Sequence, residues 1–150
     1  MAGKSDTLEF GLLQLIFNGV ATNFTPGATA GSTLIWAGLH TADPTDAGST
    51  AAEGGYTAYA RLPTERSTAS TGWAVSSGTG AALPVASPTS VLSFPQVATT
   101  STGTFSYASL WTSSNVASSG MLYYGAITPN INFSQNVTPQ ITTGSSITEE

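Results

Sequence analysis

The chain has 150 residues, with eight Asp or Glu, three Lys or Arg, one His and no Cys, which gives a net charge of −5. This length suits one domain with its own core, and the lack of Cys excludes disulfides and thiolate metal sites. Three cations give little to neutralise a row of phosphates, and no apolar stretch reaches the length of a bilayer span, so we expect neither nucleic acid nor a membrane as partner.

The N-terminal stretch is expected to form a short helix over residues 6–17. Asp6 followed three residues later by Glu9 matches a capping box, and Asn18-Gly19 supplies residue types that close a helix. We treat residues 1–19 as the helix and its cap. The helix would pack on its own sheet or dock on another subunit, because its apolar side chains cover more than one face. The apolar residues expected at such an interface are Leu8, Leu12, Leu13, Ile16 and Phe17.

After residue 19 the sequence changes to short β-prone runs separated by Gly, Pro, Ser and Asn, a pattern typical of antiparallel β-structure. We expect residues 20–150 to form a jelly-roll-like or Greek-key β-sandwich of seven or eight strands, so that the fold class is all-β with one short helix. Residues 78–88 are expected to be a loop or an irregular edge. The predicted strands span residues 33–40, 56–62, 71–76, 89–94, 104–111, 120–127 and 137–142.

One segment gathers ionisable side chains, namely His40, Asp43 and Asp46, with Glu53 shortly after them. Their spacing fits neither a zinc motif nor a calcium loop, and we expect no metal or cofactor. The Asp-Pro and Asp-Ala-Gly sequences favour turns in which Asp binds backbone N–H groups and Gly48 takes positive φ. A hydrolase would need His40 as its base, but the chain lacks a convincing nucleophile elbow. We therefore expect no enzymatic activity.

From residue 67 to residue 148 the chain carries no Asp, Glu, Lys, Arg or His and is rich in Ser and Thr. A neutral surface of this kind loses little free energy to desolvation when copies or partners pack against it. Aromatic residues could fill the core or stack on sugar rings in a groove. We expect Trp73 at a partner interface, together with Arg61 and Arg66, which flank Glu65 and could form a small ion-pair network at a subunit boundary.

Residues 34–44 (LIWAGLHTADP) and 55–61 (GYTAYAR) resemble small virion structural proteins of tailed bacteriophages. Residues 94–95 and 120–126 (GMLYYGA) extend this likeness to nearly the whole chain. The resemblance implies a short helix followed by a β-domain, a role as capsid decoration (cement) or tail-fibre-like protein, and no catalytic residues.

On this basis we expect a homo-oligomer, a dimer or trimer, on the virion. Our leading hypothesis is a decoration protein at the capsid surface that clamps the major capsid protein. The alternative is a tail-fibre or receptor-binding module that recognises a host surface. A hydrolase at His40, Asp43 and Asp46 is the third hypothesis.

Overall fold

The computed structural model describes residues 2–4, 34–65, 70–76, 85–117 and 120–148. These residues form ten strands, all of them paired in the antiparallel direction, and three of the strands are only two residues long. In the same ranges, no helix has the length and apolar character needed to cross a bilayer. The all-β class and the antiparallel pairing are thereby confirmed, whereas the jelly-roll or Greek-key winding stays a prediction.

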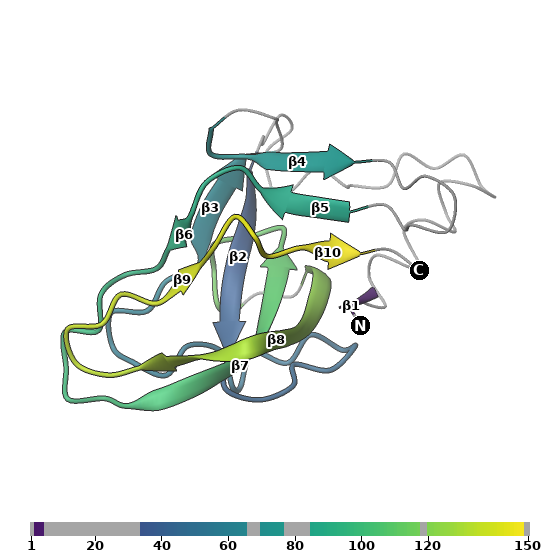
Figure 1. Cartoon of the computed structure of the whole chain (residues 1–150). Helices are drawn as coiled ribbons and strands as arrows, with labels where there is room; N and C mark the ends of the chain where they lie inside the picture. Colours follow the sequence, from purple (N-terminus) through teal and green to yellow (C-terminus); the bar gives the residue numbers. More distant parts are fainter. Residues whose placement is uncertain (1, 5–33, 66–69, 77–84, 118–119, 149–150) are drawn as a thin grey trace.

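The largest sheet has five strands, which lie in the order β1-β8-β7-β2-β3 (Figure 1). At its centre β2 and β7 are predicted correctly, because their alternating apolar and small residues favour a pleated strand. Pro129 lies in β8 beyond the residues that pair with β1, where one strand edge is open and a missing N–H is tolerated. The strands are β1 (Ala2–Lys4), β2 (Leu34–His40), β3 (Leu62–Glu65), β7 (Gly103–Trp111) and β8 (Met121–Phe133).

Two smaller sheets, β10-β5-β4 and β6-β9, are parts of one interrupted ribbon. Ile147 pairs with Ala86 and Ile141 pairs with Leu92, so the register is unchanged across the gap between them. Figure 1 shows β5 followed by β6 running beside β9 followed by β10. The strands are β4 (Trp73–Ser76), β5 (Val85–Pro88), β6 (Leu92–Ser93), β9 (Gln140–Ile141) and β10 (Ile147–Thr148).

The hydrophobic core joins one face of the five-stranded sheet to the segment that contains β6. Leu39 and Phe105 come from the sheet, while Phe94 and Val97 come from the segment, and all four are at most 2% exposed. The rings of Phe105 and Phe133 stack with their centroids 4.5 Å apart. Dense aromatic packing therefore supplies the stabilisation that a chain without disulfides needs.

Two tyrosines enter this core from a turn, although residues 56–62 were predicted to be a strand. The Tyr59 N–H donates to the Tyr56 carbonyl at 3.0 Å, and β3 begins only at Leu62. The Tyr59 ring stacks on Phe94 at a tilt of 10° and meets the Tyr56 ring edge to face. The predicted strand was wrong because the burial of both tyrosine rings in the core decides the local structure. The β-propensity of tyrosine reflects only its fit to packed surfaces, which a turn can also provide.

Other boundaries also differ from the prediction. Residues 85–88, expected in a loop or an irregular edge, form β5, which pairs with β4 on one side and the distant β10 on the other. The strands expected at 89–94 and 137–142 shrink to β6 and β9, while the strand expected at 120–127 extends to Phe133. Residues 2–4, expected in the helical region, pair with β8. The predicted helix over residues 6–17 lies outside the described residues.

Replacing Tyr56 with Phe is expected to lower the free energy of unfolding by about 0.5–1.5 kcal/mol, because the hydroxyl donates to the Pro95 carbonyl at 2.6 Å. Urea unfolding followed by tryptophan fluorescence measures this change. The matched control is Tyr107→Phe, which alters a half-buried tyrosine outside the core cluster. Equal losses in the two variants would contradict a specific role for the Tyr56 hydroxyl.

Candidate functional site

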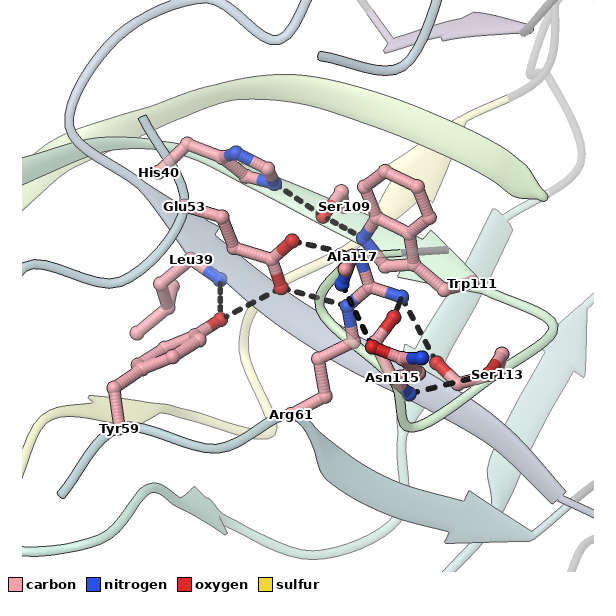
Figure 2. A network of polar contacts seen from close by, with 10 residues as sticks. All are labelled: Leu39, His40, Glu53, Tyr59, Arg61, Ser109, Trp111, Ser113, Asn115 and Ala117. Carbon is pink, nitrogen blue, oxygen red and sulfur yellow. Dashed lines mark hydrogen bonds and ion pairs between the residues drawn. The ribbon is translucent and has the colours of Figure 1, made fainter. Parts of the chain in front are cut away.

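Opposite the hydrophobic core, the second face of β2 and β7 carries a buried polar network (Figure 2). Gly38 pairs with Ser109 across the two strands, and His40 and Trp111 lie on the same face because side chains alternate along a strand. Residues 52–54 run beside the end of β2 at the edge of the sheet. The Gly54 N–H donates to the Leu39 carbonyl, and a backbone bridge joins His40 to Glu53.

The centre of the network is an ion pair between Glu53 and Arg61. Arg61 Nε donates to Glu53 Oε1 and Arg61 Nη2 donates to Oε2, both at 2.7 Å, so the pair is bidentate. The Arg61 side chain is 0% exposed and the Glu53 side chain 1% exposed. Glu53 Oε1 also accepts a hydrogen bond from the Tyr59 hydroxyl at 3.2 Å. Both charges are thus removed from water and satisfied by partners within the fold.

Arg61 also fixes the connection that follows β7. Its Nη1 donates to the carbonyls of Ser113 and Asn115 at 2.9 and 3.0 Å, and its Cζ lies 3.6 Å from the centroid of the Trp111 ring. The Asn115 side chain in turn accepts from the Ala117 N–H. One guanidinium therefore holds together the residue 49–61 segment, the end of β7 and the start of the β7–β8 connection.

His40, Ser109 and Trp111 form the other half of the network (Figure 2). Ser109 Oγ lies 2.6 Å from His40 Nε2 and accepts from Trp111 Nε1 at 2.6 Å. Within the described part of the chain, the buried His40 Nδ1 has no hydrogen-bond partner. Burial lowers the pKa of His40 to about 4, an effect that the negative charge of Glu53 partly opposes. His40 is consequently neutral near pH 7.

Burial also raises the pKa values of two tyrosines near this network. For Tyr59 the main cause is desolvation, and the negative charge of Glu53 adds to it. For Tyr56 desolvation alone raises the pKa. Both hydroxyls therefore stay protonated at neutral pH and can donate the hydrogen bonds described above, to Glu53 and to the Pro95 carbonyl.

The geometry bears on the hydrolase hypothesis. His40 and Ser109 are 0% and 4% exposed, so their pair is buried in this structure. A catalytic triad places a carboxylate on the second ring nitrogen of the base, whereas His40 Nδ1 lacks such a partner among the described residues. The arrangement matches a side-chain network that joins β2 and β7 to the segment beside the edge of β2.

The metal hypothesis needs convergent ligands. In the described ranges, no group of three or more His, Asp and Glu side chains is placed to hold a metal ion. Asp43 Oδ1 accepts the Thr45 N–H at 2.8 Å, and Gly48 has a φ of 70°. The turn predicted from this sequence is confirmed. In it, Asp43 and Asp46 are exposed, whereas His40 is buried.

Of the residues predicted to contact partners, only Arg61 and Trp73 lie among the described residues, and both have partners within the chain. Arg61 was expected at a subunit boundary with Glu65; in the structure it is 3% exposed and pairs with Glu53, and its contact with a partner stays a prediction. Trp73 is half-buried and its Nε1 donates to Thr64 Oγ1 at 3.0 Å. The predicted contacts at Leu8, Leu12, Leu13, Ile16, Phe17 and Arg66 lie outside the described residues.

Sequence reasoning missed Ser109 and the pairing of Glu53 with Arg61. One signal was present: Gly38 interrupts a strand of larger residues, which often marks a close approach of another group. A Cβ at Gly38 would lie 2.9 Å from both Glu53 Oε1 and Ser109 Oγ and 3.1 Å from Trp111 Nε1. Glycine at this position makes room for the network.

Replacing Gly38 with Ala is therefore expected to lower the free energy of unfolding by about 1–3 kcal/mol, because buried polar groups would have to move apart. Urea unfolding measures the loss. Gly144→Ala is the matched control, since a Cβ there meets only Thr142 Oγ1 at 3.8 Å, an ordinary contact. A Gly38→Ala variant as stable as this control would contradict the close packing.

Taken together, fold and network define an all-β protein whose buried ionic and polar groups hold its strands and connections in place. The sequence model of the family described as "Podophage GP4 fiber I protein gp80" matches residues 3–148. The chain belongs to this family of tail-fibre-like bacteriophage virion proteins, which confirms the resemblance drawn from its sequence. No curated protein matches the chain.

Proposed function

We propose that the protein is a structural subunit of a fibre on the virion of a tailed phage and acts without catalysis. The observation that carries this proposal is the match of residues 3–148 to a fibre family. The sequence alone favoured capsid decoration over a tail fibre. Tail fibre now stands before capsid decoration, because the matched family is described as a fibre protein.

The distribution of charge supports a role in contacts between neutral surfaces. Between residues 34 and 148, the described side chains include one positive group, Arg61, and it is buried against Glu53. Asp43 and Asp46 are exposed, so the described surface there is neutral or acidic. Burying such a surface against another copy requires little desolvation of charge, which supports the proposed homo-oligomer, whereas phosphate-rich partners find no exposed cation in these ranges.

The fold supports the same proposal. Antiparallel strands and a core shared between the large sheet and the β6 segment suit the sandwich that we expected, and we keep its Greek-key or jelly-roll winding as part of the proposal. A non-catalytic role is supported by the burial of His40 and Ser109. If the His40→Ala variant assembles normally, the result fits a non-catalytic role. Loss of a hydrolytic activity in that variant would overturn the non-catalytic role.

Cryo-electron microscopy of virions that carry an epitope tag at the C-terminus of this chain, decorated with a specific antibody fragment, tests the proposal. The untagged virion is the matched control. We expect label on appendages of the tail in a small number of copies. Label spread over the head in hundreds of copies would overturn the fibre proposal.

Capsid decoration is the second candidate. The observation that favours it is the neutral surface itself, which suits a broad footprint on the major capsid protein as well as it suits contacts in a fibre. The labelled virions separate the two locations. Co-sedimentation of the purified chain with capsids that lack it adds a direct test of binding to the head.

A further inference from the structure

A groove of about 550 Å³ lies between the large sheet and the interrupted ribbon. Of the residues that line it, Ala37, Leu110 and Leu92 are buried, whereas Trp73 and Tyr123 are half-buried. Thr128 and Ser146 line it at exposed positions. The groove thus combines buried apolar residues, aromatic side chains and hydroxyl groups, and its size falls within the range of small-molecule sites.

None of the described residues that line the groove is Asp, Glu, Lys, Arg or His. An anionic or cationic ligand would lose its hydration there without gaining an ion pair. The lining instead matches a ligand with apolar faces and neutral hydroxyl edges. A pyranose ring has C–H faces that stack on aromatic rings and hydroxyl groups that exchange hydrogen bonds with Ser and Thr side chains and with backbone groups.

We propose that this groove binds a neutral saccharide, with the sugar ring on Trp73 or Tyr123 and its hydroxyls toward the rim at Thr128, Ser145 and Ser146. The inference deepens the proposed fibre function and rests on it for its biological meaning, since a fibre with such a groove would attach to uncharged surface polysaccharide. The hydroxyl groups at the rim favour a sugar over an acyl chain, because an acyl chain has no hydrogen-bonding groups beyond its headgroup.

Gly144 offers a position at which the groove can be blocked. It lines the groove, its φ lies outside the left-handed region, and a Cβ there would meet only Thr142 Oγ1 at 3.8 Å. Gly144→Phe is therefore expected to fill part of the groove and leave the fold intact. Thr143→Phe is the matched control, since Thr143 is exposed and does not line the groove.

Saturation-transfer NMR on the full chain tests the proposal, with unfolding midpoints recorded for each variant. The probes are neutral tetrasaccharides of glucose, galactose and mannose, a sialylated tetrasaccharide of similar length, and dodecanol. We expect transfer to the ring C–H protons of at least one neutral probe, an affinity at least about tenfold lower in Gly144→Phe, and an unchanged affinity in Thr143→Phe.

Three results would overturn the proposal: no transfer to any neutral tetrasaccharide, equal affinity in Gly144→Phe and Thr143→Phe, or stronger binding of the sialylated probe or of dodecanol. Its failure is distinguishable from that of the fibre function. Labelled tail appendages without saccharide binding would remove only the groove proposal, whereas saccharide binding by a chain labelled on the head would remove the fibre role.

Discussion

Replacing Arg61 with Met is expected to lower the free energy of unfolding by about 3–5 kcal/mol, the usual range when one partner of a buried pair is removed. Methionine keeps much of the apolar stem, but the Glu53 carboxylate would remain buried without its bidentate partner. The carbonyls of Ser113 and Asn115 would also lose their donor. Urea unfolding followed by tryptophan fluorescence measures the loss.

Two further variants separate the ion pair from general packing. The double variant Glu53→Gln with Arg61→Met is expected to lose less stability than the sum of the single variants, because neither charge then stays buried alone. Asp46→Asn is the control for removing an exposed charge and is expected to change stability by less than about 0.5 kcal/mol. An Arg61→Met loss below about 1 kcal/mol would contradict the central position of this pair.

Stability is also expected to fall as the pH decreases from 7 toward 4. Burial lowers the pKa of His40 in the folded protein to about 4, whereas its ordinary value is 6.5. The unfolded chain therefore binds a proton at a higher pH than the folded chain, so lowering the pH favours unfolding. From these two values we expect a loss of about 2 kcal/mol between pH 7 and pH 5, and about 3 kcal/mol once both states are protonated.

The variant His40→Gln isolates this effect, because His40 is the only histidine in the chain. Glutamine stays neutral and can still reach a hydrogen-bond partner such as Ser109. Urea unfolding of both proteins at intervals from pH 5 to pH 8 should show a stability that depends on pH in the native chain and a nearly flat profile in the variant. Equal slopes in the two proteins would show that His40 titrates alike in both states.

Local sequence patterns predicted the parts of the fold that local physics decides. The alternation in residues 33–40 and 104–111 identified β2 and β7, and the Asp43 turn followed from side chains that bind nearby backbone groups. Residues 85–88 and 56–62 were misassigned because their structure depends on distant partners. β5 is held by β4 and β10, and the tyrosines at 56 and 59 turn into a core completed by Phe94 and Phe105.

The polar network was beyond the reach of local patterns for a similar reason. Arg61 reaches Glu53 eight residues earlier, but it also reaches carbonyls more than fifty residues later, and His40 reaches Ser109 across 69 positions. Charged residues are usually exposed, so Arg61 was placed at the surface. In a chain with so few charges, an Arg that follows two tyrosines at positions 56 and 59 could have indicated a buried pair, and Gly38 was the second signal.

The pairing of β1 with β8 joins the first residues of the chain to residues near its end, since Gly3 lies opposite Tyr124. A ribosome that adds about 5–20 residues per second would finish β8 on the order of 6–25 s after β1. Until then the edge of β1 has no native strand beside it. Translation speed should thus set the earliest moment at which newly made subunits can close their sheet and begin to associate.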